Sequence, residues 1–100
     1  MRILGMADGG SNTEDIARRI VALREALGYN QSSFATLVEI SQPAMNNYEA
    51  GIRRPSLEVA IKMRLRTGVT LDWIYLGQRE GLPGRLLSVL PDLSDRRKAG

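Results

Sequence analysis

A series of helix-start and helix-stop residues divides residues 13–77 into short segments, and no other feature restricts the possible folds of this chain as strongly. Within the segments, apolar residues recur every three or four positions, which is the spacing of one helix face. Candidate N-terminal caps are Thr13, Asn30, Ser41, Ser56 and Thr70, and candidate stop residues are Gly28, Gly51, Gly68 and Gly77. No segment alternates apolar and polar residues over the length of a strand. We therefore predict an all-α fold, a compact bundle of about five short helices.

The apolar spacing also predicts which side chains face the core. In the first helix the predicted buried residues are Ile16, Ile20, Leu23 and Leu27, and in the fourth helix they are Leu57, Ala60, Ile61 and Leu65. One hundred residues are enough for a single compact domain of this kind.

The outward face of the third predicted helix is rich in side-chain amides. When Met45 and Tyr48 point into the core, a step of about 100° per residue turns the other side chains outward. These outward residues are Pro43, Asn46, Asn47 and Ala50, with Gln42 beside them. An amide donates and accepts at once, which matches the N6 donor and N7 acceptor of adenine, and an apolar Pro43 or Ala44 can contact a thymine methyl. An uncharged surface without a ligand is the alternative explanation.

The amino-acid composition argues against several classes of function. The chain has no Cys and no His, which removes disulfides, thiolate metal sites and the commonest general base. We therefore expect no enzyme activity, no cofactor and no metal site. The formal net charge of +3 is too small to indicate a nucleic-acid partner by itself. No apolar run approaches the roughly 18 residues of a membrane span.

Several stretches of the sequence together resemble a known family. They are Asn30-Gln31-Ser32-Ser33-Phe34-Ala35, Ile40-Ser41-Gln42, Met45-Asn46-Asn47-Tyr48-Glu49-Ala50-Gly51, Arg54-Pro55-Ser56 and the run from Gly68 to Gly77. At this spacing they resemble the phage-repressor (Cro/CI-type) helix-turn-helix family, the lambda-repressor-like domain, over residues 13–77. The resemblance implies a DNA-binding domain with a central helix-turn-helix. The helix starting at Gln31 would cross the DNA backbone, and the helix starting at Gln42 would enter the major groove.

The resemblance also implies roles for individual residues. The base-reading or groove-facing positions are Gln42, Pro43, Ala44, Asn46 and Asn47. The phosphate-contacting positions are Asn30, Gln31, Ser41, Arg53 and Arg54, and Arg18 and Arg19 are further candidates. Glu49 matches a structural glutamate that pairs with an arginine of the first helix, and Arg24 stands at the matching position.

Two residues depart from the family pattern. Glu39 stands where the motif usually has Gly in the turn. We expect either a left-handed Glu, at a cost of roughly 1 kcal/mol, or a turn that closes differently. Pro43 removes a hydrogen-bonding side chain from a position that often reads a base. Direct readout therefore shifts onto Gln42, Asn46 and Asn47.

We expect three regions along the chain. Residues 1–12 form a flexible N-terminal arm, residues 13–77 form the DNA-binding domain, and residues 78–100 form a C-terminal extension with a short helical segment and a polar tail. The stretch from Leu71 to Leu90 is the predicted dimer interface. Its apolar residues exceed what so short a helical tail is expected to bury against its own domain.

These observations lead to a functional expectation with two alternatives. We expect a cytoplasmic, nucleoid-associated transcriptional regulator, a repressor, that binds double-stranded DNA at an inverted-repeat operator as a homodimer. The first alternative keeps the fold but makes protein interaction the main task, as in an antitoxin that neutralises a partner toxin. The second is an enzyme, although no nucleophile and base can be combined without His or Cys.

Overall fold

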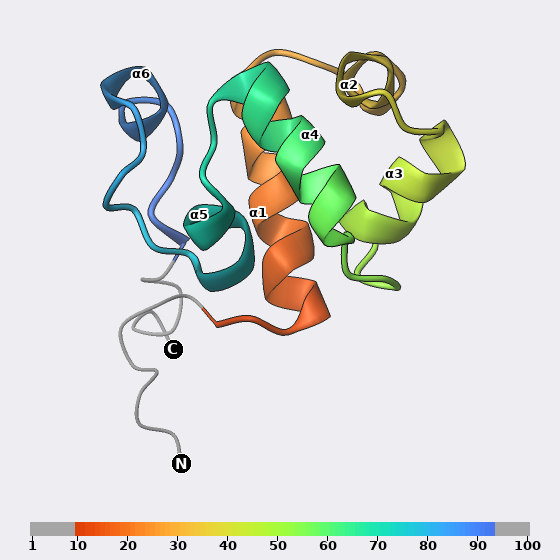
Figure 1. Cartoon of the computed structure of the whole chain (residues 1–100), viewed down its shortest axis with the longest axis horizontal. Coiled ribbons are helices and arrows are strands. Elements are labelled where there is room, and N and C mark those ends of the chain that lie inside the picture. The colour runs from red at the N-terminus through yellow and green to blue at the C-terminus, as the bar shows by residue number, and fades with distance from the viewer. Residues whose placement is uncertain (1–9, 94–100) are drawn as a thin grey trace.

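The computed structural model describes residues 10–93, which contain six helices and no strand. The helices are α1 (Thr13–Ala26), α2 (Gln31–Val38), α3 (Gln42–Glu49), α4 (Leu57–Thr67), α5 (Leu71–Leu76) and α6 (Gly84–Leu87) (Figure 1). The predicted all-α fold is confirmed. Most of the predicted arm and the polar end of the predicted extension lie outside the described residues. Within residues 10–93, no helix has both the length and the apolar character that crossing a membrane requires.

The helix ends follow the sequence signals with one exception. The side chains of Asn30, Ser41, Ser56 and Thr70 each accept a hydrogen bond from a first-turn backbone N–H, so these four predicted caps are confirmed. The predicted cap of α1 is wrong, because Asn12 and not Thr13 accepts the backbone N–H of Asp15, at 2.8 Å. Asn is a stronger N-cap than Thr, and Thr13 becomes the first residue of the helix.

One hydrophobic core holds the helices together, and α1 contributes its buried stripe. Ile16, Ile20 and Leu23 are buried as predicted, while Leu27 is only partly buried at the end of the helix. Figure 1 shows α4 crossing in front of α1, with α2 and α3 on one side and α5 and α6 on the other. Helix α3 therefore stands at the edge of the molecule opposite α6.

The fourth helix buries Ala60 as predicted, but the rest of its buried face differs from the predicted one. Its buried residues are Ala60, Met63 and Thr67, whereas Leu57, Ile61 and Leu65 are exposed. Both sets satisfy helical spacing, so spacing alone does not distinguish them. The small side chain of Ala60 lets the helix approach the core closely, and the Thr67 hydroxyl donates to the Met63 carbonyl at 2.7 Å.

The first part of the C-terminal extension belongs to the same core. Leu82, Leu86 and Leu90 are buried in it. The guanidinium of Arg79 donates to the backbone carbonyls of Leu87, Leu90 and Pro91 at 3.0–3.2 Å. The dimer prediction for Leu71 to Leu90 assumed more apolar residues than the domain can bury. This assumption is wrong for most of them, because the core of the domain contains them.

Candidate nucleic-acid interface

Helices α2 and α3 are joined by a tight turn at residues 39–41. Glu39 adopts the left-handed conformation with φ 68°, the first of the two outcomes expected for this position. The backbone N–H of Ile40 donates to the Ala35 carbonyl at 3.0 Å, which closes the end of α2. Buried Phe34 and Val38 of α2 belong to the same core as Met45 of α3. The two helices are thus held in a fixed relation by the core between them.

Two basic residues of α4 hold this turn, and neither contact is predicted by the sequence pattern. The Lys62 ammonium donates to the Glu39 carbonyl at 3.2 Å, and Arg66 forms an ion pair with the Glu39 carboxylate. Exposed contacts of this kind contribute under about 1 kcal/mol each, so they offset at most part of the left-handed strain. The sequence does contain a weak signal for these contacts. Glu39, not a glycine, stands in the turn, and Lys62 and Arg66 lie four positions apart elsewhere in the chain.

Behind α3 lies an ion pair that is largely shielded from solvent. Arg24 of α1 binds Glu49 with both arms of its guanidinium, at 2.8 Å from Nε to Oε2 and 3.1 Å from Nη2 to Oε1. The side chains of Arg24 and Glu49 are 16% and 6% exposed. The remaining nitrogen of Arg24 donates to the Tyr29 carbonyl at 3.0 Å. The carboxylate is therefore fixed in position by paired donors.

A chain of hydrogen bonds runs from this carboxylate to the surface. Gln31 donates through Nε2 to Glu49 Oε1 at 3.2 Å, and Gln42 donates through Nε2 to Gln31 Oε1 at 3.5 Å. An ionised carboxylate only accepts, so Gln31 must turn its NH₂ toward Glu49 and its oxygen toward Gln42. Gln42 must then turn its NH₂ toward Gln31. Its own oxygen and its second N–H have no partner among residues 10–93 and can bind a ligand.

The outward face of α3 presents uncharged polar and small side chains. Gln42, Pro43 and Asn46 are exposed, while Ala44 and Asn47 are partly buried. A groove of about 330 Å³ runs along this face and is lined by Gln31, Gln42, Pro43 and Asn46. The structure therefore brings the predicted amides together on one surface, with Asn47 at its inner margin.

The loop after α3 carries Arg53 and Arg54, and both are exposed. The Asn47 carbonyl accepts the backbone N–H groups of Ile52 and Arg53, at 3.0 and 3.3 Å, and so folds the loop back on the end of α3. The loop that carries the two arginines therefore lies next to the end of α3, and neither is paired with a carboxylate in the described part of the chain.

Tyr75 of α5 anchors the same loop from the other side. Its hydroxyl donates to the Pro55 carbonyl at 2.9 Å. Burial raises the pKa of the Tyr75 hydroxyl above its ordinary value of 10.0, and the positive charge of Arg54 lowers it in part. The hydrogen bond requires the neutral phenol, so this contact is stable through the neutral pH range.

The other predicted phosphate-contacting residues have additional structural roles. Asn30 and Ser41 lie at the N-terminal ends of α2 and α3, where their side chains cap the helices. Arg19 is wrong as a phosphate candidate, because it is buried and its Nε donates to the Ile74 carbonyl at 2.9 Å. Arg18 forms an ion pair with Asp15 at 2.8 Å.

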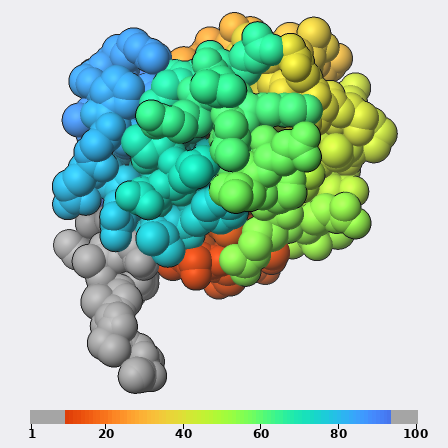
Figure 2. Space-filling view, viewed as in Figure 1, coloured from red at the N-terminus to blue at the C-terminus, as the bar shows by residue number. Residues whose placement is uncertain are grey.

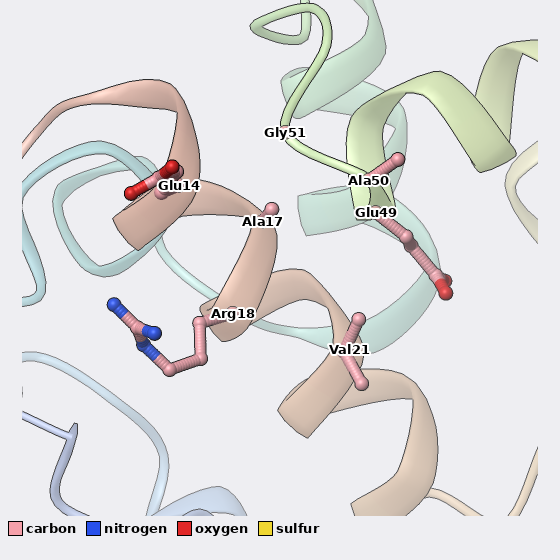
Figure 3. Close-up of a pocket in the computed structure, with 7 residues that line it drawn as sticks. All are labelled: Glu14, Ala17, Arg18, Val21, Glu49, Ala50 and Gly51. Carbon is pink, nitrogen blue, oxygen red and sulfur yellow. The ribbon is translucent and has the colours of Figure 1, made fainter.

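A second groove, of about 350 Å³, lies between α1 and the end of α3 (Figure 3). Glu14, Arg18 and Glu49 are the charged residues of its lining. With two carboxylates and an arginine already paired to Asp15, this groove does not favour an anion. Within residues 10–93, no three side chains of the metal-binding types are grouped for an ion.

A model of the helix-turn-helix family matches residues 20–74, more than half of the chain. The chain belongs to the helix-turn-helix family. The match begins within α1 and ends within α5, so it includes the turn at Glu39 and the amide surface of α3. Membership in the helix-turn-helix family indicates a DNA-binding regulator and implies double-stranded DNA as its ligand. Comparisons with curated proteins and with solved structures gave no match.

Proposed function

We propose that this protein is a transcriptional repressor of the phage-repressor type that binds an inverted-repeat operator as a homodimer. The observation that carries the proposal is the chain of hydrogen bonds from Glu49 through Gln31 to Gln42. A surface amide without a ligand needs no fixed orientation. An amide that reads a base does need one, because exchange of its oxygen and nitrogen exchanges acceptor and donor.

The orientation of Gln42 favours adenine as its base. Its free oxygen can accept the adenine N6 amino group, and its second N–H can donate to N7. Guanine offers acceptors at both O6 and N7, so the oxygen of Gln42 would face another oxygen. Asn46 and Asn47 supply further amides for neighbouring bases, and Pro43 and Ala44 supply apolar contacts for a thymine methyl.

We assign the phosphate contacts to the residues that border this surface. Arg53 and Arg54 provide charge from the loop, and Asn30, Gln31 and Ser41 stand at the starts of α2 and α3, where backbone N–H groups and the partial positive charge of the helix favour phosphate. All these residues fall within 13–77, the range we assign to DNA binding. In the extension, residues 78–100, the part up to Leu90 completes the core through Leu82, Leu86 and Leu90.

A dimer sets the geometry of the operator. Two recognition helices that read one face of a duplex lie about 34 Å apart, one helical turn, so the half-sites should be about 10 base pairs apart. Each half-site should present an adenine to Gln42 and a thymine methyl to Pro43 or Ala44.

Selection of bound sequences from random duplexes at two salt concentrations tests this proposal. The parent should enrich an inverted repeat that contains an adenine in each half-site. With Gln42→Ala, the preference for adenine at that position should disappear or change to another base. The matched control is Gln78→Ala, an exposed glutamine outside α3, which should select the same repeat as the parent. Failure of the parent to enrich any repeat would refute the proposal. It would favour the alternative function, binding of a protein partner such as a toxin.

A further inference from the structure

The outward face of α4 carries three large apolar side chains at intervals of four residues. Leu57, Ile61 and Leu65 are 61%, 41% and 76% exposed. Side chains at this spacing lie above one another on one face of a helix. Helix α4 lies at the front of the molecule in the space-filling view, where its residues form a continuous part of the surface (Figure 2).

This apolar stripe, Leu57, Ile61 and Leu65, is separate from the face by which α4 joins the core. At about 100° per residue, the centre of the stripe lies about 130° around the helix from the arc that contains Ala60, Met63 and Thr67. The other exposed large apolar residues among 10–93 are Ile52, Leu87 and Val89, none of them on a helix face with a second such residue four positions away. Contiguous apolar surface of this kind marks an interaction site.

The charges beside the stripe are arranged for pairing with a copy of themselves. Glu58 lies on one flank of the stripe, and Lys62 lies further around the helix on the same flank. When two α4 helices run antiparallel and cross at Ile61, Leu57 of each copy faces the partner's Leu65. Glu58 of each copy then lies within one helical turn of the partner's Lys62, so two opposite-charge contacts form by symmetry.

We propose that the stripe is the contact surface between two copies of this chain, packed antiparallel about Ile61. The inference rests on the proposed homodimer and names its interface. Lys62 and Arg66 reach Glu39, so this flank of α4 faces the turn between α2 and α3. A two-fold axis along that direction keeps both helix-turn-helix units on the same side of the dimer, as two half-sites on one face of a duplex require.

A cysteine cross-link gives the most direct test, because the chain contains no cysteine of its own. Ile61→Cys places one thiol from each copy at the two-fold axis, and Val89→Cys, at a site 48% exposed, serves as the matched control. On mild oxidation of the full chain, Ile61→Cys should form a covalent dimer and Val89→Cys should form far less. Equal cross-linking of the two variants, or preferential cross-linking of Val89→Cys, would overturn the proposal.

A second measurement does not depend on disulfide geometry. Leu65→Glu should raise the Kd of the dimer at least about tenfold in sedimentation equilibrium, because each dimer carries the change twice. Val89→Glu should leave the Kd unchanged, and circular dichroism should show both variants folded, since both sites are exposed. A dimer that persists in Leu65→Glu, or a parent that stays monomeric at every concentration, would overturn the interface.

These outcomes are separate from those for DNA binding. If the parent enriches an inverted repeat while Ile61→Cys does not cross-link, the operator function stands and the α4 interface fails. If Ile61→Cys cross-links and no repeat is enriched, the interface stands and the operator function fails.

Discussion

The outward face of α3 carries amides that hydrogen bonds connect to a shielded carboxylate, whereas the outward face of α4 carries exposed leucine and isoleucine. The first surface has directional groups whose orientation is set from behind. The second has no directional groups and offers only apolar area. A ligand with donors and acceptors in a fixed pattern suits the first, and a nonpolar partner surface suits the second. Substitutions on and behind these surfaces test the contrast.

Removal of the carboxylate behind α3 should have the largest effect. Glu49→Ala leaves Arg24 without its partner in a shielded site, and the loss of one member of a buried ion pair typically costs about 3–5 kcal/mol. Chemical denaturation should show this decrease in the free energy of unfolding. Glu80→Ala, an exposed carboxylate in the loop after α5, is the matched control and should change it by less than about 0.5 kcal/mol. Equal melting temperatures for Glu49→Ala and the parent would contradict the role given to the pair.

Truncation of the base-reading amide should affect affinity and leave the fold intact. Gln42→Ala should lose about 1–3 kcal/mol of binding free energy on the selected operator and little on random DNA. Titration of both duplexes by fluorescence anisotropy measures the difference. A loss of the same size on both duplexes would mean that Gln42 does not read a base.

Loss of a loop charge should show a smaller effect that is independent of sequence. Arg54→Ala should weaken binding to operator and random DNA alike and lower the slope of log K against log salt by about one per subunit. Titrations at several salt concentrations give this slope. Arg64→Ala, an exposed arginine of α4 away from the amide surface, should leave the slope as it is in the parent. A change of specificity in Arg54→Ala would contradict a phosphate contact.

The smallest effect should appear at alkaline pH. The raised pKa of Tyr75 means that the folded state holds this proton more tightly than the unfolded state, where the pKa is near 10.0. The stability due to this group is fully present below that value and is lost as pH rises through the folded pKa. Tyr75→Phe should therefore lose less stability than the parent between neutral and strongly alkaline pH in thermal melts. Parallel curves for the two proteins would contradict the shift.

Local signals explain most of what the sequence predicted. The caps at Asn30, Ser41, Ser56 and Thr70 need only a side chain and an N–H three residues later. The inward direction of Met45 and Tyr48 was predictable because α3 has only one apolar stripe. The sequence of the third helix is therefore enough to predict which of its side chains face outward.

Non-local packing explains what the sequence did not reveal. Helix α4 has two arcs with apolar spacing, and its contacts with α2 and α5 decide which one is buried. The burial of Leu82, Leu86 and Leu90 depends on space left by helices far away in the sequence. The link from Gln31 to Glu49 joins residues on different helices, and no spacing rule within one helix predicts it.

The contacts of Glu39 with Lys62 and Arg66 fasten α4 to the turn that precedes α3. In the proposed dimer, each recognition helix is therefore attached rigidly to the α4 interface and not through a flexible linker. The distance and twist between the two recognition helices are then fixed. Each base pair inserted between the half-sites turns one of them by about 35° around the duplex axis, and no loop in this connection can absorb that rotation. Such a regulator would tolerate a changed base at the centre of its operator more readily than a changed length.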